Sequence, residues 1–379
     1  MTPHRTLVRA ATAFAALLVI ALSAATSARD TTQPSVPGKP GHIFIIILEN
    51  KAYANTFSPK SLAPYLAHEL PAKGALLRNY YGIGHNSLDN YIALVSGQAP
   101  NIATQTDCKK FTEFKLDKPT LDENGQAIGS GCVYPAIVPM LGDQLEKVGK
   151  SWRGYMQDLG NDRSKAVEEC GYPPIGESDQ TSHRTPADQY ATKHNPFYYF
   201  HGFIDNHDRC VQHVVNLHHL SDDLKSIATT PNYSFITPNL CDDGHDAPCI
   251  DKSTGGLMQA DGFLRKWVPQ ILDSPAFKKD GVLIITFDEA SGPPGMDSSA
   301  CCGEQGLPGA SRQPGGDGPG GGRVGAVILS PFVKPNTISD VPYNHYSTLR
   351  WVEDQFGVPH LGYAAAKGLV TFGEDVFVR

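Results

Sequence analysis

The sequence contains no basic runs, and its formal charge of −7 makes the chain mildly acidic. A protein that binds nucleic acid needs a positive surface to attract the phosphate backbone. The composition therefore argues against a nucleic-acid partner.

Several motifs of known enzyme classes are also missing. The sequence has no P-loop, and no serine stands in a G-x-S-x-G elbow. No Cys or Ser stands in the C/S-x-P-x-R context from which sulfatases make formylglycine, and no internal repeat occurs. P-loop enzymes, Ser-His-Asp hydrolases and sulfatases are therefore disfavoured.

The one long apolar run lies at the N-terminus. Residues 11–24 are apolar, basic residues precede them, and small residues follow up to Ala28. The run is too short for a membrane-spanning helix and predicts a secretory signal peptide over residues 1–28, with an uncleaved anchor as the alternative. No Cys follows the run to favour a lipoprotein, and no later stretch is long enough to cross a membrane.

All eight cysteines follow this segment. An even number of cysteines in an exported protein favours disulfides over a thiol enzyme. Order along the chain favours Cys108–Cys132, Cys170–Cys210 and Cys241–Cys249, although order alone leaves other pairings open. The adjacent Cys301 and Cys302 either bridge each other or pair elsewhere, and a zinc site is less favoured because no second Cys/His pair is near. We expect a secreted protein, extracellular or in the cell envelope.

Three apolar stretches predict strands of a central sheet. Residues 42–48 and 281–287 are continuous apolar runs, the pattern of strands buried on both faces, and residues 323–330 form a third. A further strand begins at Tyr233, and helical patterns lie between the strands, among them residues 61–70, 217–227 and 255–272. This alternation predicts an α/β fold with a mostly parallel sheet. Residues 29–41 form a polar lead-in, and residues 42–379 are expected to be one domain.

Polar residues follow three of these strands. In a parallel sheet they would meet at one edge, where open α/β sheets bind their ligands. Carboxylates and imidazoles this dense repel each other unless a cation or a network of donors lies among them, and they suit Zn, Mn, Fe, Mg or Ca. Helix capping, ion pairing and a solvated acidic turn are the alternatives. The residues are Glu49 and Asn50, then Asp242, Asp243, His245 and Asp246, and finally Asp288 and Glu289.

Two helix starts and one aromatic segment supply further candidates. Ser87 begins a predicted helix that ends at Gly97, and His345 lies in the first turn of another. Ser87 could be an N-cap only, but the free N–H groups of a helix N-terminus also suit a phosphate and a nascent alkoxide. Lys193 and His194 lie beside four aromatic rings, and they either bind a substrate anion or belong to a packed loop.

Two long segments carry few periodic signals. Residues 100–134 contain two cysteines and are expected to form a disulfide-tied excursion. Residues 291–322 are rich in Gly and Pro, which predicts a flexible loop over the sheet edge.

Six motifs together resemble one family. They are HIFIIILEN, HNSLDNYIALVSG, KHNPFYYF, PNLCDDGHD, ITFDEA and NHYSTLRWVED. The chain resembles, over residues 41–364, the phosphoesterase family of bacterial phospholipases C and secreted acid phosphatases, in the alkaline phosphatase superfamily. The resemblance implies a three-layer αβα sandwich with an alkaline-phosphatase-like central sheet.

The same resemblance implies roles for individual residues. Ser87 would be the nucleophile, and His245 a second catalytic residue near the leaving group. Two positions depart from the pattern, since the late strand is followed by Asp-Glu rather than Asp-His, and Ser87 by Leu-Asp-Asn rather than Leu-Pro-Asn. The implied metal ligands are Glu49, Asn50, Asp243, Asp246, Asp288, Glu289 and His345, and the implied substrate-binding residues are Asn90, Lys193 and His194.

The expected function is a secreted, metal-dependent phosphomonoesterase of the acid phosphatase type. Its substrate would be a phosphate ester, with phospholipid and phosphoinositide headgroups among the candidates. A phospholipase C-type phosphodiesterase is the alternative, although long enzymes of that type carry C-terminal domains and this chain ends soon after its sheet. A non-catalytic calcium-binding protein is the alternative from another class, because it would keep the carboxylates but would not need Ser87.

Overall fold

The computed structural model describes Met1 and residues 39–290, 297–309 and 312–377. Apart from Met1, the predicted signal peptide lies outside the described residues, as do most of the lead-in and parts of the Gly/Pro-rich loop. The described residues from Lys39 onward form one compact unit.

An eight-stranded sheet runs through this unit in the order β11-β2-β10-β9-β1-β8-β6-β7. Five neighbouring strands, from β9 to β7, are parallel, and β11 is parallel to β2. The predicted mostly parallel sheet is therefore confirmed. The bounds are β1 His42–Leu48, β2 Ala75–Leu77, β6 Trp152–Met156, β7 Val214–Asn216, β8 Tyr233–Thr237, β9 Gly281–Phe287, β10 Ala326–Leu329 and β11 Thr337–Ser339.

The central strands agree with their sequence pattern. Every residue of β1, β8 and β9 is buried, as a strand with helices over both faces requires. The predicted bounds of β1 and β9 are confirmed to the residue. The third apolar run also forms a strand, β10, but it runs antiparallel to β9 because a long loop, rather than a crossover helix, connects the two.

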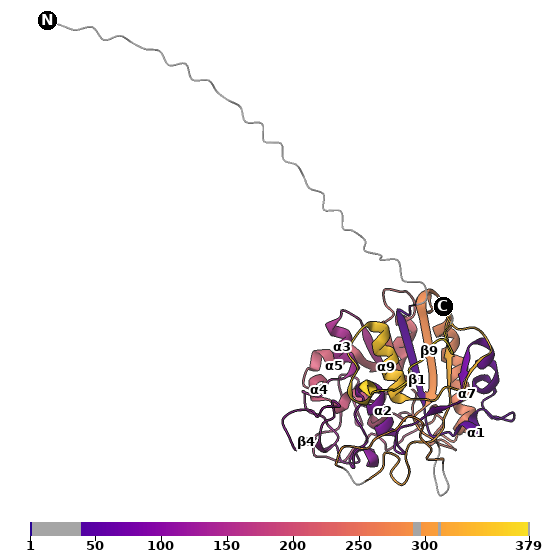
Figure 1. Ribbon diagram of the computed structural model, residues 1–379, viewed down its shortest axis with the longest axis horizontal. Coiled ribbons are helices and arrows are strands. Elements are labelled where there is room, and N and C mark those ends of the chain that lie inside the picture. Colours follow the sequence, from indigo (N-terminus) through magenta and orange to yellow (C-terminus); the bar gives the residue numbers. More distant parts are fainter. Residues whose placement is uncertain (2–38, 291–296, 310–311, 378–379) are drawn as a thin grey trace. The chain divides into compact units, whose positions relative to one another are not determined.

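Helices cover both faces of the sheet. In Figure 1, α2 (Ser87–Ser96) and α9 (His345–Phe356) lie on one side of β1 and β9, and α7 (Gly256–Asp273) lies on the other. The remaining helices are short: α1 Tyr53–Thr56, α3 Leu141–Lys147, α4 His201–Ile204, α5 His207–His213, α6 Leu220–Asp223 and α8 Pro275–Asp280.

Helix α2 is buried along its whole length and ends where the sequence predicts. Gly97 caps it with φ 67°, a left-handed conformation that glycine adopts without strain. A Cβ at Gly97 would also lie 2.2 Å from the carbonyl oxygen of Leu361. The glycine is thus needed both for the helix end and for close packing.

Two predicted helices are shorter than expected. The helical pattern over residues 61–70 becomes one π-helical turn, η1 (Tyr65–Glu69), since Pro64 and Pro71 restrict the backbone on either side. The pattern over residues 217–227 divides into a 3₁₀ turn, η6 (Leu217–His219), and α6.

The cysteines form four disulfides, and the three pairs expected from chain order are confirmed. The fourth bridge joins the adjacent Cys301 and Cys302. Such bonds persist in oxidising compartments, which agrees with export.

The two long segments lie against each other. The Leu307 N–H donates to the Pro100 carbonyl at 3.0 Å, and the side chain of Gln105 donates to the carbonyls of Gln313 and Pro314. The described parts of the Gly/Pro-rich loop are therefore bound to the excursion, whose own ends are joined by Cys108–Cys132.

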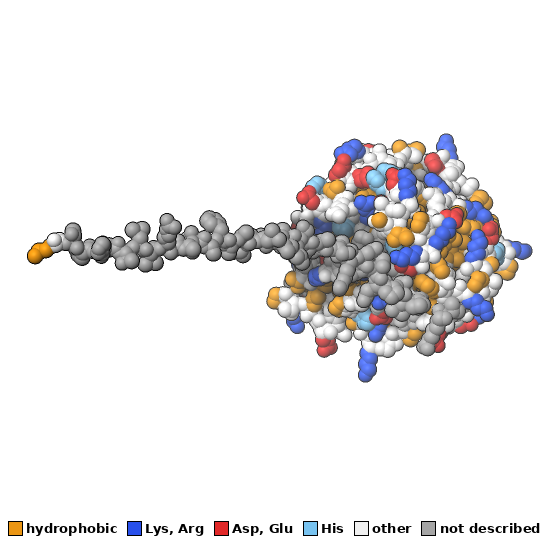
Figure 2. Space-filling model, turned by 90° about the horizontal axis from the view of Figure 1, so that it is seen from above, with side chains coloured by type: hydrophobic (Ala, Val, Ile, Leu, Met, Phe, Trp, Pro, Cys, Tyr) orange, Lys and Arg blue, Asp and Glu red, His pale blue; other side chains and the backbone are white. Residues whose placement is uncertain are grey.

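Acidic and basic side chains are interspersed over the face shown in Figure 2. Within the described ranges, no helix is both long and apolar enough to cross a bilayer.

Candidate active site

Three strand ends meet at one edge of the sheet, as the sequence predicts. Leu48 and Phe287 are paired across β1 and β9, so Glu49 and Asp288 leave the sheet side by side. The Asp288 N–H donates to the Leu48 carbonyl, and the Glu49 N–H donates to the Asp243 carbonyl, both at 2.9 Å. Glu49, Asp243 and Asp288 are each fully buried.

Ser87 faces this carboxylate cluster. It is the first residue of α2, and its Oγ donates to Glu49 Oε2 at 2.7 Å. The helix is capped differently, because Asp107 Oδ1 accepts from the Leu88 N–H at 3.2 Å. The side chain of Ser87 is thus directed at a carboxylate and does not serve as a cap.

Glu289 is held by two asparagines. The side-chain amide of Asn50 donates to Glu289 Oε1 at 3.3 Å, and that of Asn90 donates to Oε2 at 3.1 Å. Asn90 Oδ1 accepts from the N–H groups of Ile83 and Gly84. The Asn50 N–H donates to Asp288 Oδ1 at 3.0 Å. These amides fix the orientation of the carboxylates that follow β9.

The cluster concentrates negative charge in a buried place. Burial raises the pKa of Glu49 well above its usual value, and the nearby Asp288 adds to this effect. Burial likewise raises the pKa of Asp243 and of Glu289, and it raises the pKa of Asp288 to about 7. Without a compensating cation, such groups are costly to keep ionised.

Two lysines supply part of that positive charge. Lys193 Nζ donates to Asp107 Oδ2 at 3.0 Å, and although burial lowers its pKa, Asp107 and Glu49 raise it above its usual value. Burial lowers the pKa of Lys51, which the carboxylates of Asp243 and Asp288 partly oppose. Two ammonium groups are fewer than the four carboxyl groups they approach.

His194 belongs to the same cluster. Its Nε2 lies 3.3 Å from Glu49 Oε1 and its Nδ1 lies 3.6 Å from Asp243 Oδ2. Burial lowers its pKa well below the usual value, and Lys193 adds to the effect. The predicted pair Lys193 and His194 therefore lies at the site, with its polar groups beside the carboxylates.

The four ligand-type residues of the acidic loop face different partners. Asp242 accepts from Gln157 at 2.6 Å and from Gln259 at 2.7 Å, away from the cluster. Asp246 pairs with Arg184 and with His245 Nδ1. Asp243 is the member of the loop whose carboxylate lies next to Glu49.

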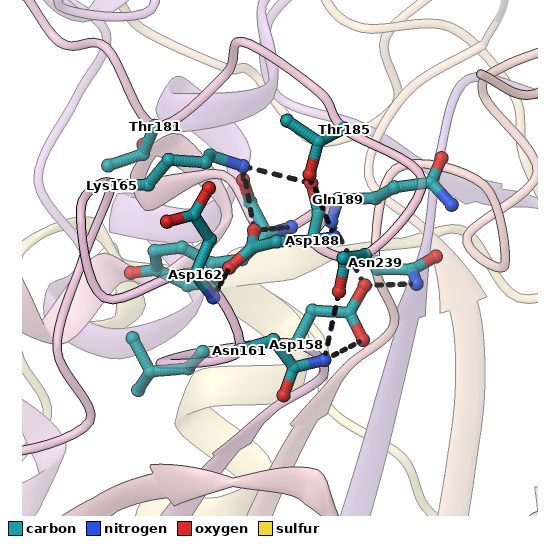
Figure 3. Close-up of polar contacts among 12 residues, drawn as sticks. Asp158, Asn161, Asp162, Lys165, Thr181, Thr185, Asp188, Gln189 and Asn239 are labelled. Carbon is teal, nitrogen blue, oxygen red and sulfur yellow. Dashed lines mark hydrogen bonds and ion pairs between the residues drawn. The ribbon is translucent and has the colours of Figure 1, made fainter. Parts of the chain in front are cut away.

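A second polar network holds the segment that carries Arg184 (Figure 3). Lys165 Nζ lies 2.6 Å from Asp188 Oδ1 in a buried ion pair. Asp158 accepts from the Gln189 N–H at 3.0 Å and from the side chain of Asn239 at 2.7 Å. The network joins residues 158–190 to the start of the acidic loop and so positions Arg184 against Asp246.

His345 lies behind the cluster rather than in it. Its Nε2 is 2.6 Å from the Asp288 carbonyl oxygen, and its Nδ1 is 3.1 Å from the Tyr80 hydroxyl. Burial lowers its pKa to about 4. With both nitrogens engaged, His345 supports the end of β9, and in this arrangement it offers no lone pair to a metal, in contrast to the role that the resemblance implies.

Comparisons with known proteins show the family of this chain. The model of the Phosphoesterase family matches residues 59–359. The chain belongs to the phosphoesterase family. The match begins after Glu49 and Asn50, and it includes Ser87, the acidic loop and the Asp288–Glu289 pair.

Several curated phosphatases are similar to this phosphoesterase. An acid phosphatase from Aspergillus fumigatus is 25% identical over 350 residues, which cover 90% of this chain and 62% of that protein. A phosphatidylinositol-3-phosphatase from Mycobacterium tuberculosis is 25% identical over 329 residues, with coverage of 85% and 79%. The chain spans 57% to 64% of the length of the acid phosphatases that it matches.

Among solved structures, an alkaline phosphatase superfamily protein from Vibrio parahaemolyticus gives a TM-score of 0.46 at 12% identity. The similarity covers 85% of this chain and 67% of that chain.

The cluster of this phosphoesterase has the donor chemistry of a divalent-cation site. Asp243 Oδ2, Asp288 Oδ2 and Asn50 Oδ1 are buried and accept no hydrogen bond from the described residues. Unpartnered buried oxygens beside other carboxylates fit a hard cation. In the described residues, the groups of three His, Cys, Asp or Glu donor atoms that lie within 4.8 Å of one another occur elsewhere, for example Glu168 with His218 and His219. The donor atoms of the Glu49 cluster are therefore spaced more widely than those of such a group.

Four residues at the site were not among the candidates predicted from the sequence: Lys51, Tyr91, Asp107 and Arg184. Tyr91 carried a signal, because it lies one helical turn after Ser87 and shares its face. Lys51 directly follows the Glu-Asn pair. Asp107 and Arg184 lie in irregular segments, and no periodic pattern places them.

Proposed function

We propose that this protein is an exported phosphomonoesterase of the acid phosphatase type, with Ser87 as its nucleophile and a divalent cation as its cofactor. The observation that carries the proposal is the 2.7 Å hydrogen bond from Ser87 Oγ to the buried Glu49, at a helix N-terminus and among unpartnered carboxylate oxygens. Family membership and similarity to curated phosphatases support it.

The cation would be held by Glu49, Asn50, Asp288 and Asp243. Glu289 would lie beside them, oriented by its hydrogen bonds from Asn50 and Asn90. A bound divalent cation supplies charge neutralisation, a lower hydroxyl pKa at the serine and a clamp for phosphoryl oxygens.

The chain's own groups account for the transfer. Ser87 Oγ attacks phosphorus, the phosphorus–oxygen bond to the alcohol breaks, and Glu49 Oε2 is the acceptor toward which the hydroxyl proton points. The ammonium of Lys193, which pairs with Asp107 beside the cluster, would contact the phosphoryl oxygens. Water then attacks the phosphoserine, releases phosphate and restores the hydroxyl.

His245 is the candidate donor to the departing alcohol. Its Nδ1 is 2.9 Å from Asp246 Oδ1, which fixes the ring, and its side chain is 37% exposed. A donor at the rim of the site can reach leaving groups of different sizes. Arg184 holds the Asp246 end of this arrangement.

The test is an assay of purified protein on three substrates after chelation and after return of single metals. An aryl phosphate monoester, a bis-aryl phosphate and a phosphoinositide monophosphate distinguish the functions. We expect hydrolysis of monoesters that chelation abolishes and one divalent ion restores. Preferred hydrolysis of the diester would favour the phospholipase C-type alternative, and metal binding without turnover would favour the calcium-binding alternative.

A further inference from the structure

We propose that Tyr91 is a positioning residue that sets the orientation of the Glu49 carboxylate and thereby the aim of Ser87. The inference rests on the proposed function and adds to it a residue that makes no contact with substrate. It follows from three contacts on the Glu49 carboxylate and from two ring contacts of Tyr91.

The first contact is a hydrogen bond. Tyr91 Oη donates to Glu49 Oε1 at 2.8 Å, and Ser87 Oγ donates to Glu49 Oε2 at 2.7 Å. The two hydroxyls therefore divide the carboxylate between them, one to each oxygen. Both residues and the carboxylate are buried, with exposed fractions of 0% for Tyr91 and Glu49 and 2% for Ser87.

The helix explains why both hydroxyls reach the same group. Ser87 and Tyr91 are four residues apart on α2, so their side chains lie one above the other on one face. A carboxylate can rotate about its last torsion, which is soft. A fixed phenol on one oxygen removes that freedom and leaves the other oxygen directed at the nucleophile.

The ring of Tyr91 adds a second constraint. It stacks on the imidazole of His194, with centroids 5.2 Å apart and planes 9° apart. His194 Nε2 lies 3.3 Å from the same Glu49 Oε1 that accepts from Tyr91. The ring of Phe235 makes a T-shaped contact with Tyr91, with ring centroids 6.1 Å apart. Tyr91 thus joins the nucleophile helix, Glu49 and the Lys193–His194 turn.

The variant Tyr91→Phe tests this role, because it keeps the ring and the stack and removes only the hydroxyl. We expect kcat to fall by roughly 10- to 100-fold, the range seen when a residue that orients a ligand is lost, with KM for an aryl phosphate changed by less than about threefold. The affinity for the restoring metal, measured by titration, should fall as well.

Tyr155→Phe is the matched control. Tyr155 is also fully buried in the sheet, and its hydroxyl donates to a carboxylate, Asp223 Oδ2, at 2.6 Å, outside the cluster. Both variants lose one phenol–carboxylate hydrogen bond from a buried tyrosine, so their melting temperatures should fall by similar amounts. Only Tyr91→Phe should lose turnover.

A kcat of Tyr91→Phe within about twofold of wild type would overturn the inference, whatever its melting temperature. A loss as large as that of Ser87→Ala would also overturn it, since Tyr91 would then take part in the chemistry itself. If Ser87→Ala is inactive and Tyr91→Phe is not, the inference about Tyr91 fails while the proposed function stands. If Ser87→Ala retains activity, the proposed function fails.

Discussion

Two adjacent aspartates of the acidic loop have different surroundings. Asp243 Oδ2 is buried beside Glu49 and accepts no hydrogen bond from the described residues, whereas both oxygens of Asp242 are taken by glutamines. An unpartnered carboxylate oxygen is available to a cation, and a carboxylate satisfied by two amides is not. If the loop binds a cation, we therefore expect Asp243 to be a ligand and Asp242 not to be one.

We expect Asp243→Asn to lower metal content and turnover together, while Asp242→Asn leaves both within about twofold of wild type, because its interactions are hydrogen bonds to neutral amides. Elemental analysis after dialysis and an aryl phosphate assay measure the two quantities. Equal metal loss in both variants would show that the loop binds the cation as a whole.

For single residues, the sequence predicted which side chains lie near one another but not which groups each of them contacts. Glu49, Asp243 and Asp288 follow strands of one sheet, so strand pattern alone brings them together. The partners of Asp242 are Gln157 and Gln259, which lie 85 and 17 residues away and follow no motif. The resemblance implies His345 as a metal ligand, whereas its partners in the fold, a carbonyl and a tyrosine, depend on tertiary packing.

Among the elements, helix α9 contains a buried acid outside the site. Glu353 is fully buried on α9, and its Oε1 accepts from the Leu361 N–H at 2.9 Å. Burial raises its pKa to about 9 from a usual value of 4.5. The unfolded chain then releases the proton at a lower pH than the folded chain, so the stability that the protonated acid contributes is lost as pH rises from about 4.5 to about 9.

Glu353→Gln should therefore raise the melting temperature at pH 8 and have almost no effect on it near pH 4. The gain in unfolding free energy at pH 8 should be on the order of 2 kcal/mol. The amide keeps an acceptor for Leu361. The neighbouring Asp354→Asn is the control, because its ion pair with His360 lies at the surface. A stabilisation of Glu353→Gln that is the same at both pH values would contradict the argument.

The elements also show what sequence pattern can and cannot predict. Strands β1 and β9 are apolar on both faces, so their bounds could be predicted to the residue. The direction of β10 could not be predicted from its composition, because antiparallel pairing depends on the connection and an apolar run is the same in either direction. The helix over residues 61–70 was overestimated because two prolines outweigh the spacing of its leucines.

For the whole molecule, one disulfide and one buried ion pair hold irregular segments near the carboxyl edge of the sheet. The Cys241–Cys249 bridge closes the acidic loop, and the Lys165–Asp188 pair anchors the segment that reaches Asp246 through Arg184. Chain order predicted the disulfide. The ion pair joins two positions in a segment without periodicity, and only the folded structure brings them together.

The proposed mechanism depends on Ser87 as the attacking group. Its hydroxyl forms no cap, so Ser87→Ala removes one hydrogen bond to Glu49 and should cost about 1 kcal/mol of stability. Loss of a nucleophile should instead lower kcat by several orders of magnitude. The decisive measurement is the turnover of folded, metal-loaded Ser87→Ala on an aryl phosphate beside wild type. We predict an inactive protein with wild-type metal content, and a variant that retains more than about a tenth of wild-type turnover would contradict the mechanism.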